Sequence, residues 1–212
     1  MFLHEYITTK VITVPPDTLL NDAENIMKDN HIRRLPVVEK GKLLGLVTWD
    51  KLREVTPSPA TSLSIWELNY LISKIKVGEI MQKDVVTFPP DTTVEEAATL
   101  CQKRGIGTLP VVQDDKLVGI ATTTDLYNIL VQVLGFGKPG MRFHLFSCEG
   151  GELLKTAIDA IHNHGGSIQS MFQVTPPGTQ RTDTIIRTNV VDATQIVQEL
   201  RAGGCELDVR SH

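Results

Sequence analysis

The sequence has little cysteine, few aromatic residues and no long apolar run. Its three cysteines are odd in number and widely spaced, so they do not make a disulfide framework and are expected to be reduced thiols. No stretch approaches the roughly 18 apolar residues that a membrane-spanning helix needs, and no charged-then-apolar leader opens the chain. The expectation is a soluble, cytoplasmic protein without a membrane partner.

The sequence also lacks an excess of charge of either sign. It contains 25 acidic and 21 basic residues, for a net charge of -4. Proteins that bind duplex nucleic acid neutralise phosphates with many cations, so this balance disfavours a nucleic-acid partner. With 41% hydrophobic and 22% charged residues, the composition is that of an ordinary folded protein.

Standard signatures of catalysis are missing as well. The sequence shows no Ser-His-Asp triad signature, no phosphate-binding loop and no dinucleotide fingerprint. The spacing of Cys148 and the nearby histidines His144, His162 and His164 matches no standard zinc site. Cys101 falls on an apolar helix face, which predicts a core thiol rather than a nucleophile. The sequence therefore predicts a protein that is not an enzyme and has no metal site.

The sequence does contain an internal repeat, in which one unit occurs twice. Residues 3–54 can be laid without a gap on residues 77–128. Both copies carry Pro-Pro-Asp-Thr after a β-branched run, then Leu-Pro-Val-Val, then Lys-Leu, Gly, Thr and Leu at equal spacings. Two similar units that pack together leave clefts between them, and small ligands usually bind in such clefts.

Each copy predicts the order strand, helix, strand, strand, helix. Pro-Pro ends the first strand because proline lacks the amide that would continue a ladder. In the second copy Thr92 and Glu95 form a candidate capping box for the helix. The two strands that follow are predicted at 35–39 and 43–48 in the first copy and at 109–113 and 117–122 in the second. A proline-rich break and an amphipathic helix connect the copies over residues 57–76.

The last 72 residues have another pattern, which begins after a glycine-rich break at 135–140. Strands and helices are predicted over 141–212 in the order βαββαβ. Two βαβ halves of this size build a ferredoxin-like sheet with two helices on one face. The expected fold class is α+β or α/β, with domains at 1–56, 77–135 and 141–212 and a connecting helix at 57–76.

The repeated motifs resemble those of the CBS domain. A valine-rich strand, Leu-Pro-Val-Val and the run Gly119-Ile-Ala-Thr-Thr-Thr-Asp-Leu126 recur in order, and a tandem pair resembles the module in which two CBS domains bind adenine nucleotides. The resemblance implies CBS domains at 1–56 and 77–135, related by a pseudo-twofold axis. It implies a regulatory ligand such as AMP, ADP, ATP or S-adenosylmethionine and no cofactor.

The ligand site can be argued from Thr122 and Asp125, which place a hydroxyl and a carboxylate one turn apart at a strand-to-helix junction. The carboxylate could accept hydrogen bonds from both ribose hydroxyls, although Thr-x-x-Asp is also a common capping box. Thr122 and the amino end of the helix could meet ribose or phosphate. By the resemblance, the wall of the site combines these two residues with Ile120, Thr108, Ile12, Ile32 and Arg33.

The first copy departs from this pattern. Lys51 stands where the second copy has Asp125, and Asp50 is shifted by one place, which turns a helical side chain by about 100°. The pair is therefore expected to hold one competent site rather than two. Arg33 is a candidate phosphate ligand, and Arg34 a weaker one because neighbours in an extended segment point to opposite sides.

The C-terminal pattern resembles the ACT domain, a regulatory fold that often binds amino acids at a subunit interface. The resemblance implies an effector site at Gly150, Gly151, Ile168 and Gln169, although the loop lacks the proline of the usual acidic-x-Pro-Gly pattern. Glycines at such a turn can also serve geometry alone.

A CBS pair followed by an ACT-like domain resembles the small regulatory proteins grouped with the acetoin-utilisation CBS proteins of bacteria. The expected function is non-catalytic: a homodimer that senses an adenine nucleotide and alters its contacts with a regulated protein. The ACT-like domain would serve dimerisation or bind a second effector. The alternative is a dimerisation or interaction scaffold that binds no small molecule.

Overall fold

The computed structural model describes residues 1–55, 67, 70, 72–147 and 151–212. It divides the chain into two compact units, Met1–Leu126 and Tyr127–His212. The connecting helix expected at 57–76 lies largely outside the described residues, as does Gly150 of the expected effector site. The first unit contains the sequence repeat, and the second contains the C-terminal pattern.

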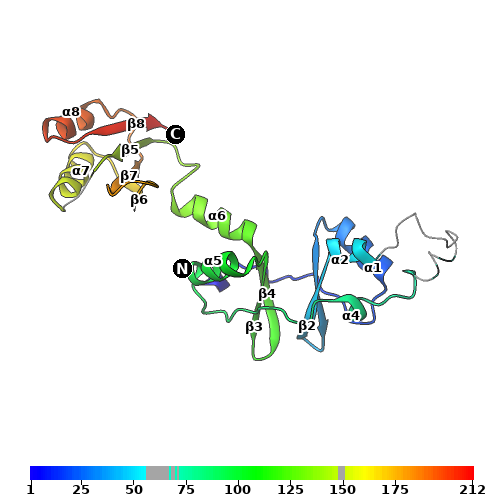
Figure 1. Ribbon diagram of the computed structural model, residues 1–212. Helices are drawn as coiled ribbons and strands as arrows, with labels where there is room; N and C mark the ends of the chain where they lie inside the picture. Colours follow the sequence, from blue (N-terminus) through cyan, green and yellow to red (C-terminus); the bar gives the residue numbers. More distant parts are fainter. Residues whose placement is uncertain (56–66, 68–69, 71, 148–150) are drawn as a thin grey trace. The chain divides into compact units, whose positions relative to one another are not determined.

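The two repeats combine into one four-stranded sheet with the strand order β1-β2-β4-β3 (Figure 1). Repeat one supplies the short 3₁₀ helix η1 (Leu3–Glu5), α1 (Leu20–Asp29), β1 (Arg34–Glu39), β2 (Lys42–Thr48) and α2 (Trp49–Val55). Repeat two supplies α4 (Val77–Ile80), α5 (Val94–Arg104), β3 (Thr108–Gln113), β4 (Lys116–Thr122) and α6 (Thr123–Val133), of which α6 continues into the second unit. The two hairpins meet where Lys42 pairs with Lys116.

The repeat symmetry extends to strand register. Arg34 pairs with Thr48 in the first hairpin as Thr108 pairs with Thr122 in the second, and both hairpins contain an irregularity after the same valine. Equivalent sequence positions therefore occupy equivalent structural positions. Thr48 and Thr122 end the strands that lead into α2 and α6, and Arg34 and Thr108 begin the strands paired with them.

The first predicted strand of each repeat is much shorter than expected. Val14 makes a single parallel bridge to Val37, and Phe88 makes one to Val111. Pro-Pro follows each bridging residue and ends the ladder there, because proline has no amide to donate. The predicted strand-helix-strand-strand-helix order holds with a one-residue bridge at its start.

The amino-terminal cap of helix α5 lies one residue later than predicted. Thr93 Oγ1 accepts the Glu96 N–H at 3.2 Å, and the Glu96 carboxylate accepts the Thr93 N–H at 3.0 Å, so the capping box expected at Thr92 and Glu95 is displaced by one position. The helix buries one face against the sheet. Cys101 lies on that buried face, and burial raises the pKa of its thiol, as expected for a core residue.

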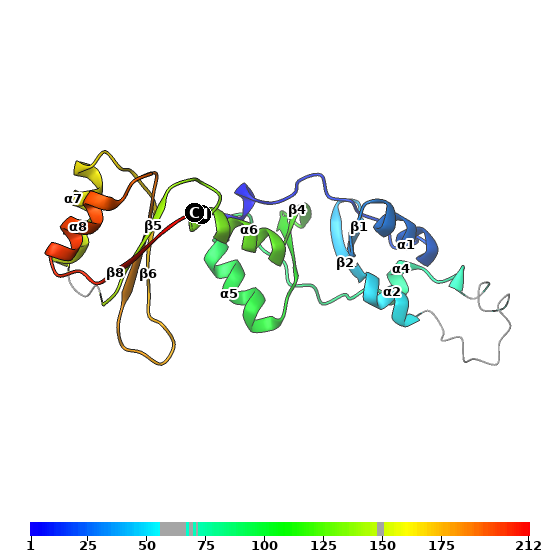
Figure 2. The same cartoon turned by 90° about the horizontal axis from the view of Figure 1, so that it is seen from above.

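The C-terminal unit has the predicted βαββαβ order and a second four-stranded sheet, ordered β6-β7-β5-β8 with all neighbours antiparallel. Its elements are β5 (Met141–Leu145), α7 (Gly151–Asn163), β6 (Ile168–Val174), β7 (Asp183–Thr188), α8 (Thr194–Ala202) and β8 (Leu207–Ser211). Both helices lie on one side of the sheet (Figure 2). Phe143, Leu145 and Ile186 point to that side and form the core with residues of α7 and α8.

The other face of this sheet carries a fully buried carboxylate, Asp183. Burial opposes its charge, but the Ser147 N–H and His144 Nε2 lie 3.2 and 3.0 Å from its oxygens. Arg181 Nε adds a cation at 3.3 Å. These contacts outweigh burial and hold the pKa of Asp183 below its ordinary value of 3.8.

Acid is therefore expected to destabilise the C-terminal unit through Asp183. Because the pKa of Asp183 is lower in the folded than in the unfolded state, its stabilising contribution is complete above about pH 4. It is lost as the pH falls through the folded-state value. Urea unfolding at several pH values between 7 and 2 should show a weaker acid dependence for Asp183→Asn than for wild type. Equal acid losses in the two proteins would contradict this role.

Candidate functional site

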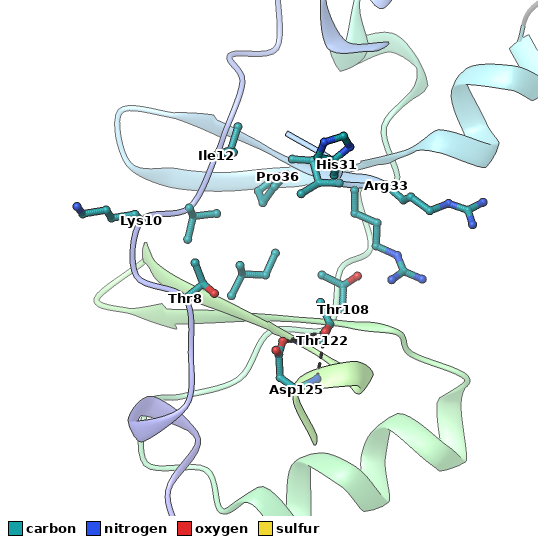
Figure 3. Close-up of a pocket in the computed structure, with 13 residues that line it drawn as sticks. Thr8, Lys10, Ile12, His31, Arg33, Pro36, Thr108, Thr122 and Asp125 are labelled. Carbon is teal, nitrogen blue, oxygen red and sulfur yellow. Dashed lines mark hydrogen bonds between the residues drawn. The ribbon is translucent and has the colours of Figure 1, made fainter. Parts of the chain in front are cut away.

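A cavity of about 320 Å³ lies between the two repeats (Figure 3). One wall comes from repeat two, with Thr122 and Asp125 at its base, and the facing wall includes His31 and Pro36 of repeat one. All seven residues predicted for the ligand site line this cavity: Ile12, Ile32, Arg33, Thr108, Ile120, Thr122 and Asp125. The structure thus brings together residues that lie up to 113 positions apart (125 − 12) in the chain.

Asp125 is held by the amino end of α6. Its Oδ2 accepts hydrogen bonds from the Thr122 N–H at 2.7 Å and from Thr122 Oγ1 at 2.8 Å. Thr122 Oγ1 in turn accepts the Asp125 N–H at 3.3 Å, which completes the capping box foreseen as the structural alternative. Within the described residues no hydrogen bond occupies Oδ1. The carboxylate can therefore cap the helix with one oxygen and present the other to a ligand.

A buried hydroxyl adjoins this carboxylate. Thr108 is 5% exposed, and its Oγ1 has no hydrogen-bond partner within the described part of the chain. An unsatisfied buried hydroxyl costs free energy, so such groups normally meet a protein atom, a water or a ligand. Thr108 lies opposite Thr122 in the β3–β4 ladder. The base of the cavity therefore offers two hydroxyls on neighbouring strands and a carboxylate in the first turn of α6.

Basic side chains also line the cavity. Arg33 Nη2 pairs with Asp50 Oδ1 at 3.0 Å, but both side chains are largely exposed, so the pair contributes little stability and can reopen easily. Lys10 and His31 also line the cavity, and they were not predicted as site residues. Lys10, Val11 and Ile12 all line the cavity, so closeness in sequence to Ile12 was the signal that could have revealed Lys10.

Arg34 reaches further than strand alternation predicted. Its Nη1 donates to the Gly107 carbonyl of repeat two at 3.1 Å. A Cβ on Gly107 would lie 2.6 Å from Nη2, so glycine leaves the room that the guanidinium needs. The side chain lines the cavity because its length carries the charge across the gap between repeats, whichever way its Cβ points.

A second cavity of about 230 Å³ is related to the first by the repeat symmetry. Thr48 takes the place of Thr122 there, and it caps α2 by accepting the Lys51 N–H at 3.2 Å. Lys51 stands where Asp125 would be needed, and its ammonium pairs with Glu54 at 3.0 Å. The second cavity therefore lacks the carboxylate that distinguishes the first. Arg34 and Thr108 line both cavities.

Three residues of the expected ACT effector site are described by the structure, and they lie apart within one chain: Gly151, Ile168 and Gln169. Gly151 begins α7, which follows the end of β5 marked by Leu145. Ile168 pairs with Thr188, as does Met141 at the start of β5, so Ile168 and Gln169 lie at the opposite end of the sheet. Within one chain, Gly151 therefore lies near one end of the sheet, and Ile168 and Gln169 lie at the other. The effector site stays a prediction. Sequence order alone does not reveal that β5 and β6 run in the same direction.

The described residues contain neither a candidate metal site nor a candidate membrane span. No group of three or more histidine, cysteine, aspartate or glutamate side chains in this part of the chain is placed to hold a metal ion. Among the helices that the structure describes, none combines the length and the apolar character needed to cross a bilayer.

Sequence comparison identifies both repeats. The family model of the CBS domain matches residues 3–57 and 77–132. The protein MJ1225 of Methanocaldococcus jannaschii is 31% identical over 132 residues, which cover 58% of this chain and 45% of that protein. The chain thus spans less than half of this relative, and the similarity concerns the repeat region.

Solved structures show the same similarity. The AcuB protein of Vibrio cholerae has a TM-score of 0.54 at 32% identity, covering 63% of this chain and 93% of that one. CBSX2 in complex with AMP has 0.52 at 28% identity, covering 62% and 97%. The CBS pair of MJ0100, in complex with 5-methylthioadenosine and S-adenosyl-L-methionine, has 0.50 at 25% identity, covering 61% and 95%. The chain belongs to the CBS domain family, and its first unit carries a tandem CBS pair.

Proposed function

We propose that this chain is a non-catalytic regulator that senses an adenine nucleotide in the 320 Å³ cavity of its CBS pair. The observation that carries the proposal is the carboxylate of Asp125 beside the unpaired, buried hydroxyl of Thr108. Ribose hydroxyls can donate to the free Asp125 oxygen, and a ligand group can satisfy Thr108. Two CBS pairs of similar fold hold adenosine compounds, which supports the same ligand class here.

The remaining residues that line the cavity include both apolar and cationic side chains, as a site for a nucleotide requires. Ile12, Ile32 and Ile120 offer apolar surface for a purine base, and Arg33 and Lys10 offer cations for phosphate. A cavity of this size is at the lower end of the range for small-molecule sites. These cations favour AMP, ADP or ATP over S-adenosylmethionine, which lacks phosphate.

The proposal includes one such site per chain. The second cavity is smaller, and the position equivalent to Asp125 is Lys51, which does not line it and pairs with Glu54. Ligand binding would regulate a partner by favouring one arrangement of a homodimer over another, with the ACT-like unit used for dimerisation or a second effector. A cytoplasmic location fits such a nucleotide sensor.

The test is thermal unfolding of the full chain with AMP, ADP, ATP and S-adenosylmethionine. A ligand present at 100 times its dissociation constant stabilises the unit it binds by about 2.7 kcal/mol. We expect this stabilisation for a phosphate-bearing nucleotide in wild type and its loss in Asp125→Ala. Lys51→Ala, at the equivalent position of repeat one, is the matched control and should retain it. Arg33→Ala should weaken binding of nucleotides more than binding of S-adenosylmethionine.

The alternative function is a scaffold that binds no small molecule, and the cap made by Asp125 on α6 favours it. Removal of such a cap costs about 0.5–2 kcal/mol without any ligand. The comparison must therefore use the ligand-induced shift within each variant. An absent shift for all four compounds in wild type, with Asp125→Ala merely less stable, would establish the scaffold and reject the sensor.

A further inference from the structure

The C-terminal sheet buries an arginine on the face away from its helices. Arg187 lies on the inner strand β7 and is 4% exposed. Its neighbour Ile186 points into the core formed with α7 and α8, so strand alternation places Arg187 on the other face. Phe136 covers the guanidinium, whose central carbon lies 3.9 Å from the ring centroid. A charged group is therefore held beneath the segment that precedes β5.

Residues 134–136, which precede β5, pack closely against Arg187. Gly135 has φ of +72°, and a Cβ there would lie 2.8 Å from Ser170 Oγ and 3.3 Å from Arg187 Cδ. Ser170 Oγ donates to the Leu134 carbonyl at 2.8 Å and fixes the segment to β6. Arg187 is thus buried by residues of its own compact unit, through the close approach of Gly135 and the hydrogen bond of Ser170.

The buried guanidinium lacks the partners that a buried charge needs. Arg187 Nε and Nη1 are both buried and make no hydrogen bond within the described residues. Gln169 Oε1, on the adjacent strand β6, is buried and unpaired in the same sense. Burying a charge without a counter-charge is costly, and burying a polar group without a partner adds to the cost. The phenyl ring satisfies one face of the guanidinium but none of its N–H groups.

A second cation faces the first across the strands. Arg142 of β5 is the direct partner of Arg187 in the ladder and is half-buried. Burial lowers the pKa of Arg187, and the charge of Arg142 lowers it further. The pKa of His212 is lowered by burial and also by the charges of Arg187 and Arg142. Like charges directly opposite each other destabilise a sheet. Within the described residues neither arginine has an acidic partner, whereas Arg210, opposite Arg142 on β8, is paired with Asp208 at 2.8 Å.

We propose that Arg187 and Arg142 form a binding site for a small oxyanion, a carboxylate or phosphate group, on the helix-free face of the C-terminal sheet. The anion supplies the counter-charge that this pair lacks and accepts hydrogen bonds from the guanidinium N–H groups. Gln169 Oε1 can accept a hydrogen bond from a hydroxyl or amino group on the same ligand. The site lies outside the CBS pair and is independent of the nucleotide cavity.

The test uses the full chain and compares sodium phosphate and sodium malonate with sodium chloride at equal ionic strength. We expect phosphate or malonate, at saturation, to raise the unfolding midpoint of the C-terminal unit on the order of 5 °C above the chloride value. A response to malonate alone assigns a carboxylate ligand, and a response to phosphate alone assigns a phosphate ligand. Isothermal titration of the same anions provides an independent measure of binding.

Substitutions distinguish the roles of Arg142 and Arg187 from that of the neighbouring Arg210. Arg142→Gln, at a half-buried position, should abolish the anion-specific shift, and Arg210→Gln should retain it because Arg210 already has an acidic partner. Arg187→Gln should also abolish the shift, but Arg142→Gln decides the matter if the buried variant does not fold. A shift that persists in Arg142→Gln would overturn the proposal.

Two other outcomes also overturn it. If neither anion raises the midpoint above chloride in wild type, the pair binds no small oxyanion. If the midpoint instead rises with protein concentration, and Arg142→Gln removes that dependence, an acidic surface of a second copy supplies the counter-charge. AMP-type ligands act on the transition of the CBS pair, so a failure here is distinguishable from a failure of the nucleotide proposal.

Discussion

Phe143→Ala is expected to lower the free energy of unfolding of the C-terminal unit by about 3–5 kcal/mol. Phe143 is fully buried on β5, an inner strand of the second sheet, and it packs in the core with residues of both helices. Truncation removes a large apolar side chain and leaves a cavity, and a strand held by ladders on both sides cannot move to fill it. Guanidinium unfolding of the full chain, followed by circular dichroism, measures the loss.

Phe172→Ala provides the control for this change. Phe172 is half-buried on the edge strand β6, so its truncation should cost clearly less. Because the chain forms two compact units, Phe143→Ala should lower one of two unfolding transitions and leave the other, together with any nucleotide-induced shift, unchanged. Equal displacement of both transitions would show that the two units unfold as one.

The repeat made much of the fold predictable from sequence. Shared motifs at fixed spacing predict shared structure, and the two hairpins indeed have the same register and the same irregularity. The strand lengths were less predictable, because only Val14 and Phe88 of the two β-branched runs bridge to a neighbouring strand. Pro-Pro ends each run where the sequence indicated, but local β propensity does not show that the residues before the bridge stay unpaired.

The cavity that we propose binds a nucleotide was predictable to the extent that its residues lie in repeated motifs. Thr122 and Asp125 stand at a junction whose counterpart in repeat one is visible in the sequence as Thr48 and Lys51. Arg34 was underestimated because alternation fixes the direction of a Cβ, whereas a long side chain can still cross to Gly107. Reach across a gap depends on the spacing of two repeats, which no local pattern contains.

In the C-terminal unit, the elements were easier to predict from the sequence than the candidate site. Its element order could be predicted from periodicity, but its candidate site could not. Arg142 and Arg187 lie 45 residues apart (187 − 142), and only the register of β5 against β7 makes them neighbours. The same register separates Gly151 from Ile168, which the sequence had suggested as one site. Long-range register is fixed by packing of the whole sheet, so sites that depend on it are found in the structure.

The repeat symmetry leads to the second large stability effect. Leu35 and Leu109 occupy equivalent positions in the two hairpins, and both are fully buried. Leu35→Ala and Leu109→Ala should each lower the free energy of unfolding of the CBS pair by about 2–5 kcal/mol. Leu19→Ala, at a position that is 38% exposed, should lower it clearly less. Denaturant unfolding with and without nucleotide measures both the loss and the response to ligand.

The two leucines together test whether the pair folds as one unit. The strands of both repeats form a single sheet, and the cavity takes its lining from both, so each substitution should displace the same cooperative transition. Neither leucine lines the cavity, so the nucleotide-induced stabilisation should survive in both variants. If Leu35→Ala instead produced a separate early transition, the repeats would unfold independently. A ligand held between them would then stabilise only their docked arrangement, and its stabilising effect would shrink with the population of the intact pair.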